Sequence, residues 1–142
     1  MKTQRQLLTI TALVAVVAAV CLTHVAGAPQ KILHLNKMIF AHSAKGADKD
    51  GGPASFSPKD HVVYCILSVE NPDAAAVYKF NWSRYDEAEN QKLIFQQELT
   101  NQTTSEVVSK FSSPTDLPPG HYKVDLWVNG HHKQSRFEVT SD

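Results

Sequence analysis

The sequence carries no excess of charge of either sign. Its 142 residues contain 14 Lys and Arg against 14 Asp and Glu. A protein that binds nucleic acid needs clustered cations that displace counterions from the phosphates, so this balance argues against a nucleic-acid partner. Charged residues make up 20% of the chain and hydrophobic residues 42%, which is unlike the composition of disordered chains. Length and composition therefore predict a single folded domain.

The sequence also lacks an apolar run long enough for a stable membrane span. Its longest one, at 7–22, would extend about 24 Å as a helix, short of the roughly 30 Å hydrocarbon core. Lys2 and Arg5 precede this run and small residues follow it, which is the layout of a secretory signal peptide. We predict a signal peptide at 1–28, export to the periplasm or the extracellular space, and no stable membrane span after cleavage.

Three alternatives to cleavage after Ala28 stay open. Pro29 is an awkward residue just after a cleavage site, so the segment could remain as an uncleaved anchor, or the cut could fall one or two residues earlier. Cys21 could instead be lipidated, although Val20 stands where a lipoprotein has a small residue. In each case the folded domain is expected at 29–142.

Cysteine is scarce, with two residues in the chain. Removing 1–28 would leave Cys65 alone, and an exported domain with one cysteine cannot form an internal disulfide. Lys2 and Arg5 would leave as well, so that 12 basic and 14 acidic groups remain and the net charge becomes −2. Because Cys65 lies in an apolar segment, we predict a small core residue rather than a reactive thiol.

Motifs for catalysis are missing too. The sequence contains no Gly-x-Ser-x-Gly, no Gly-rich phosphate loop and no His-Glu-x-x-His. We therefore predict no catalytic residue and no cofactor, and we do not expect an enzyme. Catalysis would have to come from residues scattered over several loops.

The periodicity of the chain after residue 30 favours strands throughout. No window shows an apolar stripe at helical spacing, whereas apolar and polar residues alternate in several segments. A long loop, expected to be mobile, is predicted at 43–60 because this segment is rich in Gly, Lys, Asp and Ser. The expected strands are 31–42, 61–69, 75–85, 91–99, 105–111, 121–128 and 131–139. This count predicts an all-β fold, a seven-stranded antiparallel β-sandwich.

The alternation also predicts which side chains face the core. On the strand at 91–99 we expect Leu93, Phe95 and Leu99 to point inward. The segment at 61–69 is apolar on both faces, as in a central strand that is covered on both sides. Asn129-Gly130 predicts a type I′ hairpin turn, because both residues tolerate a positive φ. The remaining expected core residues are Leu33, Leu35, Phe40, Tyr78, Phe80, Trp82, Tyr122, Val124, Leu126, Val128, Phe137 and Val139.

Three features resemble the immunoglobulin-like and fibronectin-III-like sandwiches of exported proteins. The segment 117–124, with Gly120 and Tyr122, resembles a tyrosine corner, in which the Tyr hydroxyl bonds to backbone upstream. Trp82 stands on the third expected strand, where such folds bury a Trp. Cys65 and Val124 stand where antibody domains have a disulfide, so the chain looks more like the disulfide-free relatives, among them uncharacterised bacterial envelope proteins. The resemblance implies a structural role for Cys65, Trp82, Gly120 and Tyr122, and it implies no catalytic residue.

Exposed aromatic residues are the main candidates for a partner surface. If Tyr122 and its alternate neighbours face inward, Trp127 faces outward, beside Asp125 and, across the hairpin, His132. On the other sheet, Tyr64 and Ile66 face outward if Cys65 faces inward, with Ile94 as a neighbour. A contiguous exposed patch of this kind suggests a contact surface, unless a terminal segment or the loop at 43–60 covers it.

Metal ligation is the competing hypothesis. His131 and His132 are consecutive strand residues that point to opposite faces, so they cannot easily chelate one ion, and a zinc site needs three or four ligands. Two acidic segments could offer oxygens to Ca²⁺, although neither matches a twelve-residue calcium loop. They contain Asp48, Asp50 and Gly51 in one case, and Asp86, Glu87 and Glu89 in the other.

Two sequons, at Asn81 and Asn101, would be glycosylated only in a eukaryotic secretory pathway. Taken together, the sequence predicts a small exported binding or structural module that contacts an envelope or extracellular protein, or itself, through sheet faces and loops. The alternative is a metal- or small-ligand-binding accessory protein that uses loop His and Asp residues.

Overall fold

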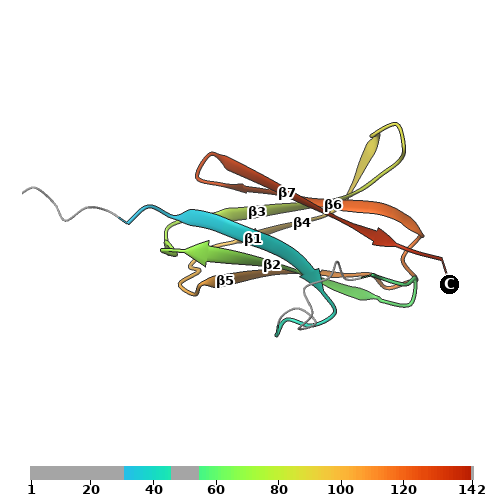
Figure 1. Cartoon of the computed structure of the whole chain (residues 1–142), viewed down its shortest axis with the longest axis horizontal. Coiled ribbons are helices and arrows are strands. Elements are labelled where there is room, and N and C mark those ends of the chain that lie inside the picture. The colour runs from blue at the N-terminus through green and yellow to red at the C-terminus, as the bar shows by residue number, and fades with distance from the viewer. Residues whose placement is uncertain (1–30, 46–54, 142) are drawn as a thin grey trace, which may run out of the picture. The chain divides into compact units, whose positions relative to one another are not determined.

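The computed structural model describes residues 31–45 and 55–141, and all of the regular structure in these ranges is β (Figure 1). The strands lie within one compact unit, Ile32–Asp142. No helix in the described part is long and apolar enough to cross a membrane. The strands are β1 (His34–Ala41), β2 (Val62–Glu70), β3 (Tyr78–Tyr85), β4 (Gln91–Leu99), β5 (Glu106–Ser112), β6 (Gly120–Val128) and β7 (His131–Val139).

The seven strands form two antiparallel sheets that lie as two layers (Figure 1). One sheet has the order β1-β2-β5 and the other the order β4-β3-β6-β7. Each of the predicted strands is present, so the seven-stranded antiparallel β-sandwich without a disulfide is confirmed. As its apolar sequence predicted, β2 is the central strand of its sheet.

Local sequence accounts for the tightest turn. Asn129 and Gly130 connect β6 to β7 with φ values of 48° and 78°, the positive values that a type I′ turn requires. This turn fixes the register, in which Trp127 lies opposite His132 and Lys123 opposite Arg136. The hairpin thereby brings polar and aromatic side chains of the two strands into neighbouring positions on one sheet face.

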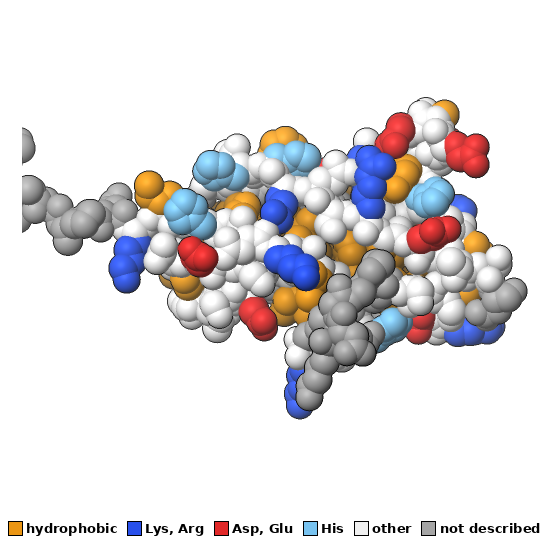
Figure 2. Space-filling model, in the orientation of Figure 1, with side chains coloured by type: hydrophobic (Ala, Val, Ile, Leu, Met, Phe, Trp, Pro, Cys, Tyr) orange, Lys and Arg blue, Asp and Glu red, His pale blue; other side chains and the backbone are white. Residues whose placement is uncertain are grey.

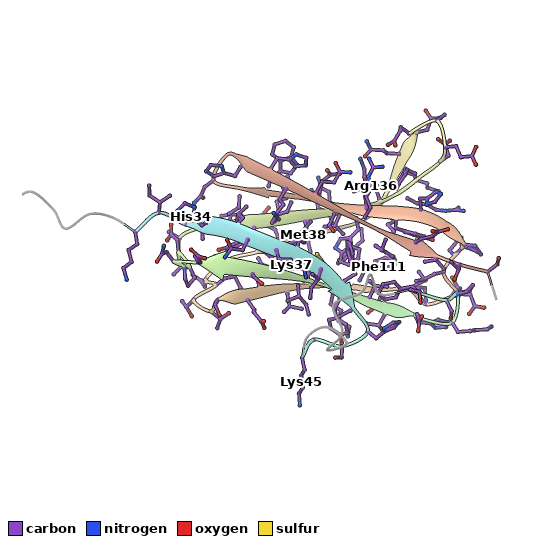
Figure 3. The ribbon with its side chains drawn as sticks, in the orientation of Figure 1. His34, Lys37, Met38, Lys45, Phe111 and Arg136 are labelled. Carbon is purple, nitrogen blue, oxygen red and sulfur yellow. The ribbon has the colours of Figure 1, made fainter. Side chains whose placement is uncertain are left out.

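The space between the sheets is filled by alternate side chains from every strand. Met38 and Phe111, labelled in Figure 3, contribute to this core from the β1-β2-β5 sheet. Cys65 is buried there as a free thiol, and burial raises the pKa of that thiol. Because the thiolate is the reactive form, this environment keeps Cys65 unreactive.

One chain of hydrogen bonds crosses the apolar core. Trp82 Nε1 donates to Ser109 Oγ at 3.0 Å, and Ser109 Oγ donates to Gln97 Oε1 at 2.8 Å. Gln97 Oε1 also accepts from the backbone N–H of Lys110 at 3.3 Å. These bonds satisfy the polar atoms that Trp82 and Ser109 carry into the core, which would otherwise be costly to bury.

The segment before β6 is held by two side chains. Tyr122 Oη donates to the Pro118 carbonyl at 2.6 Å, so the expected tyrosine-corner bond is present. Arg84 Nη2 donates to the Pro119 carbonyl at 2.7 Å. Gly120 has a φ of 141°, and a Cβ at this position would lie 3.2 Å from Arg84 Nη2. Both the backbone conformation and the approach of Arg84 therefore favour glycine.

The structure corrects one part of the predicted core. Leu93 was expected to point inward, but 55% of it is exposed. A β-bulge in β4 pairs Leu93 with Ser83 and Phe95 with Trp82, which leaves Ile94 as an extra residue. The extra residue reverses the alternation, so Ile94 packs against the core in place of Leu93.

Candidate partner surface

The outer face of the β4-β3-β6-β7 sheet carries the candidate site. Neighbouring positions on β3, β6 and β7 form three cross-strand rows on this face. We call the resulting surface the Trp127 face. It consists of Lys79, Asn81, Ser83, Lys123, Asp125, Trp127, His132, Gln134 and Arg136.

Trp127 is the large apolar side chain of this face, and 47% of it is exposed. Its ring is stacked on the His132 ring, with the centroids 4.2 Å apart and an interplanar angle of 22°. The two residues are direct cross-strand partners in the β6–β7 hairpin. The indole is therefore held in one orientation by its neighbour while much of its surface stays open to solvent.

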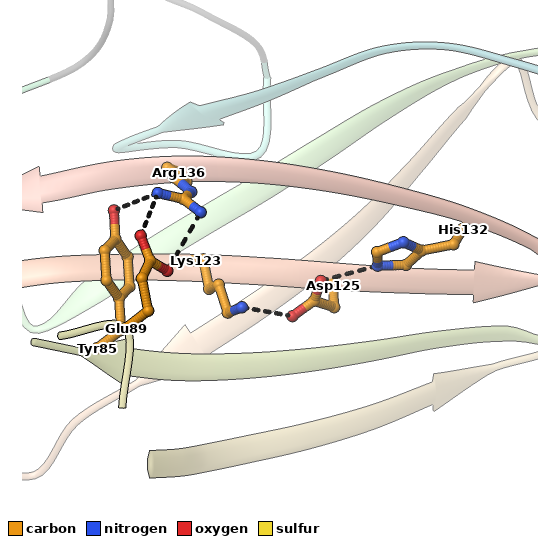
Figure 4. Close-up of polar contacts among 6 residues, drawn as sticks. All are labelled: Tyr85, Glu89, Lys123, Asp125, His132 and Arg136. Atoms are coloured by element: carbon orange, nitrogen blue, oxygen red, sulfur yellow. Dashed lines mark hydrogen bonds and ion pairs between the residues drawn. The ribbon is translucent and has the colours of Figure 1, made fainter. Parts of the chain in front are cut away.

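Asp125 joins this aromatic pair to a buried cation (Figure 4). Its Oδ1 atom lies 2.8 Å from His132 Nε2, and its Oδ2 atom lies 3.6 Å from Lys123 Nζ. The Lys123 side chain is buried, so its ammonium group needs the nearby carboxylate. Because one carboxylate serves both partners, it orders the middle of the Trp127 face before any ligand arrives.

A second cluster extends the face toward the β3–β4 turn (Figure 4). The Arg136 guanidinium lies 4.8 Å from the centre of the Tyr85 ring, and Arg136 Nη1 lies 3.3 Å from Glu89 Oε1. The Tyr85 ring also stacks on His121, with centroids 5.5 Å apart. Cation–π and ion-pair contacts at such exposed positions are individually weak, so the cluster can rearrange around a partner.

The predicted surface on the β1-β2-β5 sheet is different. Tyr64 is half-buried, with Lys110 Nζ 6.0 Å from the centre of its ring. Ile66 was expected to be exposed, but only 2% of it is, so it offers almost no contact area. Its cross-strand neighbours are Ile39 and Val108, whose apolar side chains flank it on both sides. Ile94 belongs to the other sheet and is no neighbour of this surface.

His34 lies near His131 and His132, the two histidines considered above as metal ligands. His131 and His132 are exposed, and with His34 they line a shallow cavity of about 260 Å³. Figure 2 shows several histidine side chains gathered near this end of the sandwich. Leu33, Leu35 and Lys133 complete the lining. Within residues 31–45 and 55–141, no three His, Cys, Asp or Glu side chains are grouped so that they could hold a metal ion.

Of the second acidic segment, Asp86 and Glu89 make other contacts and Glu87 is exposed. Asp86 accepts hydrogen bonds from the backbone and side-chain amides of Asn90, which lower its pKa. Glu89 pairs with Arg136. Asp48, Asp50 and Gly51, like the predicted signal peptide, lie outside the described residues.

A polar cluster that no sequence pattern indicated lies beside the segment that precedes β2. Asp116 Oδ2 lies 2.7 Å from Lys59 Nζ, and Asp116 Oδ1 lies 2.9 Å from His61 Nε2. Hydrogen bonds from Lys59 and then His61 lower the pKa of Asp116. More than 50 residues separate Asp116 from these partners along the chain, so no local pattern could have revealed the contact.

Compared with known proteins, the chain matches no family model and no curated sequence. A function for this chain is therefore inferred from the geometry of the Trp127 face and from the sequence itself.

Proposed function

We propose that this chain is a small exported binding module with an immunoglobulin-like sandwich, which contacts an envelope or extracellular protein through the Trp127 face. The observation that carries the proposal is an exposed Trp127 whose ring is held by His132, which Asp125 holds in turn. Rigid aromatic side chains give contact area at a small cost in conformational entropy, and Trp is enriched at the energetic centre of protein interfaces.

Two observations support the immunoglobulin-like assignment. The strand orders β1-β2-β5 and β3-β6-β7 correspond to strands A-B-E and C-F-G of that fold, and the bond from Tyr122 to Pro118 corresponds to its tyrosine corner. The fourth strand differs from the constant-type antibody pattern, in which it extends the A-B-E sheet. Here β4 pairs with β3, on the side where variable-type domains add strands.

The binding proposal is tested by comparing Trp127→Ser with Val77→Ser. Val77 is also an exposed apolar residue, but it lies just before β3 and outside the Trp127 face. Each variant is cross-linked to proteins of the host envelope. We expect the wild type and Val77→Ser to be cross-linked to the same partner, and Trp127→Ser to give no cross-link to it. This function would lose its support if the protein is monomeric and no partner is recovered above control. It would also lose its support if both variants lose the partner to the same extent.

Export is tested separately by the intact mass of the protein recovered from its own host. Cleavage after Ala28 predicts a mass that corresponds to residues 29–142, without lipid and, in a bacterial host, without glycan. A mass that retains the first 28 residues or carries a lipid would place the module on a membrane anchor instead.

A ligand-binding accessory protein is the second candidate, and the cavity lined by His34, His131 and His132 favours it. Since no three-ligand metal group occurs in the described ranges, a small molecule suits this cavity better than an ion. Thermal unfolding with Ca²⁺, Zn²⁺ and Cu²⁺, with and without chelator, tests the metal version, because a bound ion raises the midpoint. A flat response to all three ions would exclude it.

A further inference from the structure

The edges of the two sheets are not equally protected. An edge strand presents unpaired N–H and C=O groups, which pair readily with another chain unless they are blocked. The edge of β7 is occupied at its C-terminal end, because Phe56 bridges to Val139 and the Thr140 N–H donates to the Phe56 carbonyl at 2.9 Å. The neighbouring edge of β1 is irregular between Leu35 and Met38, and the Met38 carbonyl accepts from Ser135 Oγ of β7 at 3.4 Å.

The edge of β5 is contacted at Lys110 by a side chain of β4. Gln97 Oε1 accepts from the backbone N–H of Lys110 at 3.3 Å and from Ser109 Oγ at 2.8 Å. A partner strand that paired with β5 at this point would have to displace the Gln97 amide. Displacement would also break the hydrogen-bond chain that begins at the buried Trp82.

The edge of β4 has no such contact among the described residues. β4 pairs with β3 on one side, and its residues 91–99 make no backbone hydrogen bond outside that pairing in the part of the chain that the structure describes. The bulge at Ile94 distorts its first half, which is a common way of blunting an edge. The second half, Phe95–Leu99, pairs regularly with β3 and so presents a regular free edge.

We propose that Phe95–Leu99 pairs antiparallel with the same segment of a second copy, around a two-fold axis that passes midway between the two Gln97 residues. In this register Phe95 lies opposite Leu99 of the second copy on the core-facing side, where both are half-buried and apolar. Gln96 lies opposite Glu98 of the second copy on the outer side, as an amide that can donate to a carboxylate.

Neighbouring registers fit less well. An odd shift is excluded because it would place core-facing residues opposite outward-facing ones. With the axis at Glu98, two glutamates would lie directly opposite each other, and like charges in this position are unfavourable. With the axis at Gln96, Ile94 of the bulge would have to pair with Glu98. The segment is therefore self-complementary in one register.

This dimer would extend the four-stranded sheet into one of eight strands. Because the axis stands perpendicular to the sheet, both Trp127 faces would lie on the same side of it. Two binding faces on one rigid unit increase the apparent affinity for a partner that presents two sites, without any new contact. The pairing itself does not depend on the proposed function, since it involves β4 and not Trp127.

The test measures the mass of the intact protein by sedimentation equilibrium over a wide range of concentration, for the wild type, Gln96→Lys and Gln96→Glu. Both variants replace the amide that donates to Asn81 Oδ1, so they form a matched pair. A lysine opposite Glu98 should tighten the dimer by about 3- to 10-fold, and a glutamate there should weaken it by a similar factor, since two symmetric pairs change. Added salt should reduce both effects.

Three outcomes would overturn the proposal. The protein could stay monomeric at every concentration, or the two Gln96 variants could change the dimer affinity equally. The third outcome is a dimer that Trp127→Ser disrupts and that both Gln96 variants leave intact. The thermal midpoint of each variant is measured beside its mass, to confirm that it is folded. A dimer that follows the Gln96 charges but binds no partner would support the pairing and count against the proposed function, so the two failures are distinguishable.

Discussion

The two tryptophans of this chain lie on neighbouring strands of one sheet and have opposite surroundings. Trp82 on β3 is 0% exposed, its Nε1 atom donates to Ser109, and its ring contacts Phe40, Phe111 and Phe137. Trp127 on β6 is 47% exposed, and the ring stacked on it is His132. The inner face is thus held by dense packing and a closed hydrogen-bond chain. The outer face is held by one ring stack and by side-chain ion pairs, and much of its tryptophan ring is open to solvent.

Replacing Trp82 should have the largest effect on stability. Trp82→Ala removes a fully buried ring and leaves Ser109 without its donor, so it should lower the free energy of unfolding by about 3–5 kcal/mol. Chemical denaturation of wild type and variant measures the difference. A variant as stable as the wild type would contradict the inner position of Trp82.

Replacing Ser109 tests the polar part of the interior. Ser109→Ala leaves the buried Trp82 N–H without an acceptor and removes one of the two donors to Gln97 Oε1, so a loss of about 1–3 kcal/mol is expected. Ser83→Ala is the matched control, because Ser83 is also buried but makes no side-chain hydrogen bond within the described residues. If both variants lose the same stability, the hydrogen-bond chain contributes nothing specific.

A comparison of Tyr122 with Tyr78 isolates a smaller effect, the contribution of one side-chain hydrogen bond to stability. Both are buried, and burial raises the pKa of each. Tyr122 Oη donates to Pro118, whereas Tyr78 Oη is buried with no partner in the described part of the chain. Tyr122→Phe should therefore cost about 1 kcal/mol, and Tyr78→Phe should be neutral or slightly stabilising. Equal losses in denaturant unfolding would show that the corner bond is not what stabilises this end.

The sequence predicted the strands well because the strand signal is local. Alternation identified the inner residues of β3 and β6, and Asn129-Gly130 fixed the hairpin that places Trp127 beside His132. It failed at Leu93, because one extra residue in β4 reverses the alternation and nothing in the local pattern marks the bulge.

The rest of the site depended on contacts between distant segments. Alternation placed Ile66 on the outer side of β2, but its burial depends on β1 and β5, which pairing brings against it. The approach of His34 to His131 and His132, and the link from Ser109 to Gln97, likewise arise from the packing of strands far apart in sequence. Such contacts require the sheet order, which one sequence does not provide.

Replacing Trp127 should have a small effect on stability and the largest effect on binding. Trp127→Ser removes the stack on His132 but leaves the bond between His132 and Asp125, so the free energy of unfolding should change by no more than about 0.5 kcal/mol. Val77→Ser provides the control in the same denaturation measurement, since Val77 is similarly exposed. A loss near that of Trp82→Ala would mean that the fold itself requires the Trp127 ring. In that case the position of the Trp127 ring would be explained by the packing of the hairpin, and its exposure would no longer support a contact surface.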